Sequence, residues 1–301
     1  DKPADVVLMN GFEDDFVPKG ATFTGKRKRA RSTMLRVANC LLGEDLGDDT
    51  LIIGTSGRYE FKNKGIDVFL ESLNRLNRDK DLKKKVLAFV NVPSWVGDPR
   101  EDLQKRLKSK DKFTEPLQCP FITHWLHNMT HDQVLDMLKY LGMGNRPEDK
   151  VKVIFVPCYQ DGHDGILNKH YYDLILGEDL SVYPSYYEPW GYTPLESVAF
   201  RVPTITTDLA GFGLWVNSLK NQHGIDDGVE VLHRSDYNYS EVADGIKDTV
   251  ALFSTKTEAE IKEIRKRAGQ VAEQALWKHF IKYYYEAYDI ALCNAMKRQL
   301  R

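Results

Sequence analysis

The chain has 301 residues, of which 42% are hydrophobic and 29% charged, which is enough apolar material for one large or two medium-sized globular domains. Its net charge of −2 gives no general attraction to nucleic acid or to an anionic membrane, and no apolar run approaches the roughly 20 residues of a membrane-spanning helix. The four cysteines are widely spaced without a C-x-x-C pair, as is typical of free thiols in a reducing cytoplasm. Because the chain begins at Asp1 without a leader, we expect a piece of a longer protein.

The first part of the chain is predicted to hold one strand and one helix. Asp5–Met9 has the apolar content of a strand, and Asn10-Gly11 directly after it is a strong turn signal. The basic run Lys26–Arg31 leads into an amphipathic pattern over residues 34–42. Because the overall charge is slightly negative, we interpret the basic run as the solvated face of a helix and not as a nucleic-acid patch.

A strand, a cationic loop and a helix follow one another between residues 51 and 76. Residues 51–54 form an apolar run, and residues 66–76 place apolar side chains on one helical face. The loop between them carries Arg58 and Lys64. From the residues alone, these two side chains are either surface charges, one of them paired with Glu60, or ligands for an anion at the end of a strand.

Between the predicted buried strands 86–92 and 151–156 lies a polar insertion, residues 93–150, with helical patterns over 100–112 and 134–141. Within it, His124, His127 and His131 are spaced by three and four residues, which could place three imidazoles on one helix face as zinc ligands. No acidic or cysteine fourth ligand stands at a matching distance, and Thr130 resembles an N-cap that would interrupt that face. We therefore favour a structural role for these histidines and expect no metal.

The segment Tyr183–Phe200, read as YPSYYEPWGYTPLESVAF, joins an apolar run to a helical pattern. Thr193, Pro194 and Glu196 have the spacing of an N-cap, a first-turn proline and the acceptor of a capping box. A helix start after a strand offers unpaired N–H groups to a phosphate. Glu196 is thus either a capping group or a ligand group, whereas Glu188, which lies among aromatic residues, suits the hydroxyls of a sugar.

The remaining elements continue the alternation of strands and helices. We expect a helix over 169–176, strands over 202–206 and 229–232, a turn at Gly211–Gly213, and helices over 240–254, 257–275 and 277–296. The last helix carries more aromatic side chains than one buried stripe needs. Strands that alternate with helices predict an α/β fold, a Rossmann-like parallel sheet with helices on both faces.

Four segments together resemble a known family. They are the E-x7-E run Glu188–Glu196 with Tyr183-Pro-Ser-Tyr-Tyr before it, the loop Ser56–Gly65, the strand Val151–Phe155 and the run Thr206–Gly213. In this order they resemble retaining glycosyltransferases with the two-domain GT-B fold, and in detail they are similar to glycogen synthases of the animal and fungal type. The resemblance extends from about Val6 to the last helix.

The resemblance implies that this chain is the C-terminal, nucleotide-binding half of a GT-B enzyme. Residues 1–48 would be the end of the N-terminal domain and a linker helix. Residues 49–276 would form the Rossmann-like domain with its insertion at about 93–150, and residues 277–301 a helix that crosses back to the N-terminal domain. A longer insertion takes part in oligomerisation in the animal and fungal enzymes, so a homo-oligomer stays open as a partner here.

The resemblance also implies the reaction: glucosyl transfer from UDP-glucose to the 4-hydroxyl end of an α-1,4-glucan, with retention and without a metal or other cofactor. Arg58 and Lys64 fall on the two cations that contact the diphosphate, and with Glu188, which orients the glucose hydroxyls, they form the expected catalytic group. The amides of Gly191, Tyr192 and Thr193 can approach the same diphosphate.

Two further side chains are expected at the nucleotide: Glu196 on the ribose and Tyr171, with Tyr172 adjacent, against the uracil. The acceptor surface belongs to the N-terminal domain, so this chain alone is expected to bind nucleotide without catalysing transfer. Animal and fungal enzymes sense glucose 6-phosphate through an arginine-rich helix, and only the short run Arg265–Arg267 resembles it here.

Two other functions stay open from the sequence. A different retaining GT-B enzyme, using ADP-glucose or building sucrose, would keep the same cations and E-x7-E pair. A non-catalytic module that binds glucan or a protein partner through Tyr284 and Tyr288 of the last helix is the alternative from another functional class.

Overall fold

A computed structural model describes residues 3–220 and 222–299 of the chain. Its eight strands are β1 (Leu51–Ser56), β2 (Val86–Asn91), β3 (Val96–Pro99), β4 (His124–Leu126), β5 (Val151–Val156), β6 (Leu180–Val182), β7 (Thr204–Thr207) and β8 (Val229–Leu232). Its α-helices are α1 (Gly20–Leu42), α2 (Ile66–Asn77), α3 (Glu101–Lys108), α4 (Gln133–Leu141), α5 (Tyr171–Ile175), α6 (Tyr192–Ala199), α7 (Gly211–Asn217), α8 (Tyr239–Ser254), α9 (Glu258–Gln274) and α10 (Trp277–Gln299).

Six of the strands form one parallel sheet in the order β5-β2-β1-β6-β7-β8. Numbered by their succession in the chain, the strands of this sheet follow the doubly wound order 3-2-1-4-5-6. The order reverses between β1 and β6, where the loops that follow the two strands leave in opposite directions. The predicted Rossmann-like sheet is therefore confirmed, and its topology places a ligand crevice at the carboxyl ends of β1 and β6.

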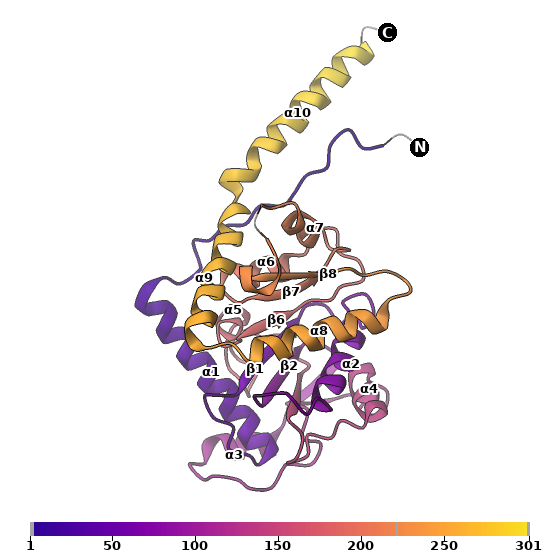
Figure 1. The fold of residues 1–301 in the computed structure, drawn as a ribbon. Coiled ribbons are helices and arrows are strands. Elements are labelled where there is room, and N and C mark those ends of the chain that lie inside the picture. The colour runs from indigo at the N-terminus through magenta and orange to yellow at the C-terminus, as the bar shows by residue number, and fades with distance from the viewer. Residues whose placement is uncertain (1–2, 221, 300–301) are drawn as a thin grey trace.

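Helices cover both faces of this sheet, because successive strand residues point to opposite sides. On β1, Leu51 and Ile53 pack into a core with α2 and α8. Ile52 points the other way, into a core with α1 and α3. A third core joins α6, α7 and α9 to the first turn of α10. Figure 1 shows these layers around the sheet.

Two local predictions were wrong, and one pair of strands was missed. Residues 5–9 form no strand; the segment runs beyond the sheet, and the first backbone pairing in the described chain is the bridge between Phe12 and Leu276. The predicted turn at Gly211–Gly213 is the start of α7, because Phe212 and Val216, four residues apart, bury one helical face. Within the insertion, β3 and β4 pair as a short antiparallel ribbon that the sequence did not reveal.

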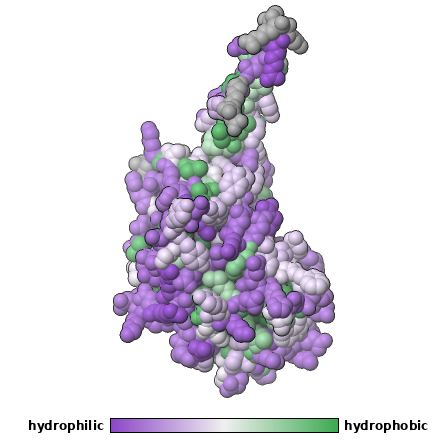
Figure 2. Space-filling view, turned by 90° about the vertical axis from the view of Figure 1, so that its right-hand side faces the viewer, coloured by the Kyte–Doolittle hydropathy of each residue, from purple (hydrophilic) through white to green (hydrophobic). Residues whose placement is uncertain are grey.

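The terminal helix α10 extends away from the body of the molecule, and the N-terminal segment leaves from the same end (Figure 1). The beginning of α10 is held by Phe280, which is buried, and one turn later by Tyr284, whose hydroxyl donates to Asn10 Oδ1 at 3.1 Å. In Figure 2 the helix stands clear of a largely hydrophilic surface. None of the helices in the described chain has the length and hydropathy of a membrane-spanning segment.

Candidate functional site

The loops after β1 and β6 meet at the carboxyl end of the sheet. Gly65 lies at their closest approach, with φ +68°, and a Cβ there would come within 2.0 Å of Pro184 O. Only glycine accepts both the positive φ and this contact. The loops are joined further by a hydrogen bond from Tyr186 N to Asn63 O at 2.7 Å. The loops after β1 and β6 are thus in direct backbone contact at this end of the sheet.

An ion pair spans the two loops. Lys64 Nζ contacts Glu188 Oε2, and the two side chains are 14% and 19% exposed. The backbone of Glu188 is fixed as well, since its N–H donates to Leu209 O at 3.2 Å and its carbonyl accepts from Gly211 N at 3.1 Å. A cation and a carboxylate from two different loops are therefore held together at the end of the sheet where this topology usually binds a ligand.

Arg58 lies outside this ion pair. Its Nε donates to Glu60 Oε1 at 2.6 Å, and 74% of its side chain is exposed. This is the surface pairing that the sequence left open. Because an exposed ion pair contributes little free energy, Arg58 can exchange Glu60 for another anion at small cost.

Helix α6 begins two residues earlier than the capping pattern predicts. Its N-cap is Gly191, at φ 103°, and no side chain caps its first turn. Thr193 lies inside the helix, so the predicted N-cap and capping box are wrong: the positive φ that only Gly191 readily adopts sets the helix start. The uncapped N-terminus, with the N–H groups of Tyr192 and Thr193 in its first turn, remains available to an anion.

Glu196 therefore has no capping role and bonds instead to α5. Its Oε1 accepts from Tyr172 Oη at 2.9 Å. Burial raises the pKa of Glu196, and the tyrosine hydroxyls lower it by a smaller amount. Tyr172 stacks on Phe200 with ring centroids 5.2 Å apart, which fixes the donor.

Tyr171 lies next to this pair, and its hydroxyl accepts from Ser56 Oγ at 3.1 Å at the end of β1. Burial raises the pKa of the Tyr171 hydroxyl, so it stays protonated at neutral pH. Its ring centroid is 5.1 Å from that of Tyr172. The structure thus brings together Lys64, Glu188, Glu196, Tyr171 and the start of α6 around the two loops, with Arg58 at the rim.

Comparison with protein families identifies the family of the chain. A family model described as glycogen synthase matches residues 41–101 and 100–301. The chain belongs to the glycogen synthase family. The resemblance read from the four sequence segments is confirmed.

Among its relatives, the glycogen [starch] synthase of Neurospora crassa is 28% identical over 304 residues, covering 82% of this chain and 42% of the relative. Isoform 2 of Saccharomyces cerevisiae is 29% identical over 314 residues, covering 84% of this chain and 44% of the relative. The liver enzyme of Mus musculus is 26% identical and covers 82% and 42%. The chain thus spans less than half the length of the curated relatives it matches.

Solved structures show the same fold. The catalytic domain of starch synthase IV from Arabidopsis thaliana, bound to ADP and acarbose, aligns with a TM-score of 0.54 at 12% identity, covering 94% of this chain and 47% of that one. Anabaena HepE, in complex with UDP and glucose, aligns with a TM-score of 0.51 at 17% identity, covering 94% and 56%. At these identities the likeness establishes the glycosyltransferase-type α/β fold.

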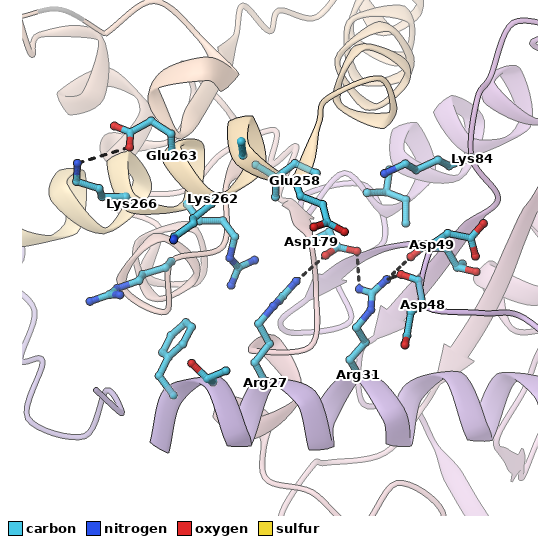
Figure 3. A pocket seen from close by; sticks show the side chains of 18 residues that line it. Arg27, Arg31, Asp48, Asp49, Lys84, Asp179, Glu258, Lys262, Glu263 and Lys266 are labelled. Carbon is cyan, nitrogen blue, oxygen red and sulfur yellow. Dashed lines mark hydrogen bonds and ion pairs between the residues drawn. The ribbon is translucent and has the colours of Figure 1, made fainter. Parts of the chain in front are cut away.

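A second charged cluster of this glycogen synthase family member lies at the amino end of the sheet. The prediction that residues 26–31 form a solvated helix face is wrong for Arg27 and Arg31, whose guanidinium groups contact the two oxygens of Asp179 at 2.6 and 2.7 Å. Asp179 Oδ2 also accepts from Ile52 N at 2.9 Å. Figure 3 shows both arginines reaching from α1 to this carboxylate.

The same end of the sheet holds a cleft of about 850 Å³ between α1 and α9. Arg265 of α9 is 9% exposed and donates to Glu178 O at 3.2 Å, while its Nη2 is buried without a hydrogen-bond partner in the described chain. Cations outnumber carboxylates in the lining, with Arg27, Arg31, Lys84, Arg201, Lys262, Arg265 and Lys266 against Asp48, Asp49, Asp179, Glu258 and Glu263.

The three histidines of the insertion do not share a helix face. His124 is buried in β4, where its ring nitrogens lie 2.9 Å from Thr123 Oγ1 and 2.7 Å from Asp164 O. His127 follows the strand and His131 precedes α4, whose N-cap is Asp132 and not Thr130. The helical zinc arrangement is therefore contradicted, as the missing fourth ligand indicated.

His124, Cys158 and Asp164 are the group in the described chain whose ligand atoms come close enough for a metal, within 4.8 Å of one another. Burial raises the pKa of the Cys158 thiol to about 12, which keeps it protonated at neutral pH. The Asp164 carboxylate already accepts from the backbone N–H groups of residues 166, 167 and 168. Both observations indicate a structural cluster.

Sequence reasoning missed Arg234, which is 6% exposed and donates to Pro184 O beneath the site loops. Its guanidinium lies 5.5 Å from the ring centroid of Tyr186. The available signal was its position: Arg234 comes two residues after the predicted strand 229–232, and carboxyl ends of parallel strands meet at one edge.

Proposed function

We propose that this chain is the donor-binding half of a glucosyltransferase that moves glucose from UDP-glucose to the 4-hydroxyl end of an α-1,4-glucan, with retention of configuration. Membership of the glycogen synthase family supports the reaction class. Because the chain spans 42–44% of its relatives' length, we assign the main acceptor surface to a domain outside it. Its four free thiols suit a cytoplasmic location.

The chemistry requires stabilisation of charge at the leaving group. Breaking the bond at C1 of the sugar leaves negative charge on the nucleotide diphosphate. Lys64 and the N-terminus of α6, which no side chain caps, follow β1 and β6 at the same end of the sheet, and their positive charge and dipole would favour that state without a metal. Arg58 would join them by leaving Glu60, an exchange that its exposure permits.

The two carboxylates, Glu188 and Glu196, would bind different parts of the donor. Glu188, anchored through its backbone to the segment before α7, would accept hydrogen bonds from the glucose hydroxyls. Glu196, positioned by Tyr172, would accept from the ribose, and Tyr171 would support the base. The single observation that supports this proposal is the Lys64–Glu188 pair at the strand-order reversal, because a lysine suits a phosphate and the carboxylate beside it suits sugar hydroxyls.

The test is calorimetric titration of the chain with UDP and with ADP in the presence of a chelator. We expect UDP to bind without metal and more tightly than ADP. Lys64→Ala and Arg58→Ala should each weaken UDP binding about 10-fold or more, since a hydrogen bond to a charged group is worth about 1.5–3 kcal/mol. Lys62→Ala, the same charge change at an exposed position of the same loop, is the matched control.

Other results of the nucleotide titration would indicate a different function. Preference for ADP would indicate an ADP-glucose or sucrose-type enzyme. Absence of nucleotide binding, both here and in a chain extended to the length of the relatives, would contradict the donor site and favour a glucan- or partner-binding module. That alternative predicts loss of partner binding in Tyr288→Ala, because Tyr288 is 56% exposed on α10, whereas Tyr284 is engaged with Asn10.

We also propose that the cleft at the amino end of the sheet binds a phosphate-bearing effector. The buried Nη2 of Arg265, unpartnered in the described chain, and the excess of cations in the lining support it. Titration with glucose 6-phosphate should show binding that weakens in Lys262→Ala, which lines the cleft. It should be unchanged in Arg267→Ala on the same helix, where Arg267 pairs with Asp227 at 2.8 Å. Equal binding by both variants would contradict the assignment.

A further inference from the structure

The ribbon of β3 and β4 carries exposed aromatic side chains that the donor site does not use. Trp95, just before β3, is 71% exposed, and its ring centroid lies 4.9 Å from that of His127. Trp125 of β4 is 36% exposed. Exposed tryptophan is costly to leave in water, so two such residues on one small ribbon call for a functional account.

These three rings share the outer face of the ribbon. Side chains alternate along a strand, and His124 and Leu126 on either side of Trp125 are buried, so Trp125 points outward. The strands pair at Val96 and Leu126, and the next pair along the ribbon is Trp95 with His127, whose N–H donates to Trp95 O at 3.1 Å. By the same alternation, this pair lies on the side of Trp125.

The face is preorganised from beneath. The guanidinium of Arg100, which is fully buried, lies 4.5 Å from the Trp125 ring centroid. It is held in place by Asp102 and by three backbone carbonyls, those of Cys119, Ile122 and Gln118. Trp125 therefore keeps one ring face against protein and the rest of its surface toward solvent, which reduces the entropy lost when a ligand stacks on it.

The charge of the face selects among ligand classes. Residues 94–99 and 124–131 contain no lysine or arginine, and Asp98 is their one acidic residue; the Arg100 guanidinium beneath Trp125 is buried and paired with Asp102. Such a surface gives no electrostatic attraction to a phosphate, a nucleic acid or an acidic peptide. It suits a neutral carbohydrate, which presents C–H groups to aromatic rings and hydroxyls to polar neighbours such as Asn128.

The ribbon is also tied to the donor loop. Asp132 accepts from Ser94 Oγ at 3.1 Å and from Tyr59 Oη at 2.7 Å, and Tyr59 is the neighbour of Arg58. Trp95 follows β2, which is the neighbour of β1 in the sheet. The aromatic face and the proposed donor site therefore lie at the same carboxyl end of the sheet, connected through one buried carboxylate.

We propose that Trp95, Trp125 and His127 form a subsite for the α-glucan chain, on the nucleotide-binding half of the protein. This inference rests on the proposed function and deepens it, because it adds to the acceptor surface assigned outside the chain a holding site within it. The sugar rings stack on the indoles, and no covalent step takes place there.

The experiment is titration of the chain with maltoheptaose, followed by calorimetry and tryptophan fluorescence, with UDP titrated separately. We expect saturable binding of maltoheptaose that weakens at least about 10-fold in Trp95→Ala. UDP affinity should be unchanged, because Trp95 makes no contact with the donor loops. Tyr140→Ala is the control, since Tyr140 is 87% exposed on α4 of the same insertion.

Trp95→Ala is the principal variant because the Trp95 ring is exposed. Maltoheptaose binding by Trp125→Ala is interpreted only if circular dichroism shows that this variant has the native fold. Absence of maltoheptaose binding while UDP binds would overturn the subsite and leave the proposed function standing. Equal weakening by Trp95→Ala and Tyr140→Ala would overturn it too. Sedimentation that shows self-association lost in Trp95→Ala, with sugar binding intact, would reassign the face to a protein interface.

Discussion

The two ends of the central sheet hold charged clusters of opposite construction. At the carboxyl end, Lys64 and Glu188 belong to two loops and pair one to one. At the amino end, Asp179 is shared by Arg27 and Arg31 of a 23-residue helix and also bonds to the backbone of β1. The loop pair can exchange partners with a ligand, whereas the helix-borne cluster has its hydrogen bonds committed to the fold. We infer that the first serves donor binding and that Asp179 with its two arginines attaches α1 to the sheet, beside the cations of α9 that line the proposed effector cleft.

The strongest way to break this comparison is Asp179→Asn. Removing the charge leaves two arginines without their carboxylate, so the free energy of unfolding should fall by about 3–5 kcal/mol. Although burial opposes it, Arg31 and Arg27 hold the pKa of Asp179 below its ordinary value. Its stabilising contribution is therefore present above about pH 4 and lost as the pH falls through the folded pKa.

Urea unfolding followed by circular dichroism measures this change. Asp173→Asn is the matched control, because Asp173 forms a single, partly exposed pair with Lys26 at 2.8 Å and should cost less than about 1 kcal/mol. If both variants lost the same stability, the cluster at the amino end would not be the attachment of α1.

Glu178, next to Asp179, is a contrasting buried carboxylate, because no arginine side chain contacts its carboxylate in the described part of the chain. Burial raises its pKa to about 8, and Ser181 Oγ donates to it at 2.6 Å. The unfolded chain releases this proton above about pH 4.3 and the folded chain retains it up to about 8, so this group lowers stability as the pH rises between them. The slope is about 1.4 kcal/mol per pH unit.

Urea unfolding at pH 5.5, 6.5 and 7.5 therefore should show the wild-type chain losing more stability than Glu178→Gln, which keeps the hydrogen bond and cannot ionise. The difference between the two chains isolates this group, because every other titration is common to both. Parallel pH profiles would mean that Glu178 ionises in the folded state.

At the carboxyl end, Lys64→Ala should affect binding more than folding. We expect UDP affinity to fall about 10–100-fold, while unfolding changes by only about 1–2 kcal/mol, because Glu188 lies on a surface loop where water can replace the lysine. Calorimetric titration and urea unfolding of the same preparation give both values. A stability loss as large as that of Asp179→Asn would remove the distinction between the two clusters.

The smallest expected effect is that of Tyr172→Phe. It removes the donor to Glu196 while keeping the ring stacked on Phe200, so stability should fall by about 1 kcal/mol and UDP affinity by a few-fold. Urea unfolding and UDP titration measure the two effects. If UDP affinity did not change, Glu196 would not be a ribose ligand positioned by this tyrosine.

Several features of the fold could be predicted because they are local. A buried strand is recognisable as a short apolar run, so β1, β2, β5, β7 and β8 were predicted within two residues of their observed ends. The capping box Thr257–Glu260 starts α9 where the pattern placed a helix. The start of α6 was predicted wrongly, since the helix begins after Gly191, whose φ of 103° only glycine readily adopts, and not at the capping pattern of Thr193.

The candidate site was predictable in composition but not in pairing. The rule that loops follow strands at one edge of a parallel sheet placed Arg58, Lys64 and Glu188 together. It could not tell that Lys64 would contact Glu188 and that Arg58 would remain with Glu60, because both loops carry acceptors and the choice depends on how the loops cross at Gly65.

The sequence by itself determined the class of fold, the succession of strands and helices, and membership of the glycogen synthase family, because these depend on periodicity and on short motifs. Only the tertiary structure decided that basic residues at the start of the chain are half-buried. Arg27 and Arg31 lie 152 and 148 positions from Asp179 in the chain. From the sequence alone a run of basic residues is predicted to be exposed to solvent, because the carboxylate that pairs with it is not nearby. Residues so far apart in the chain come into contact only when the sheet has formed, so the local sequence pattern does not indicate which of them will pair.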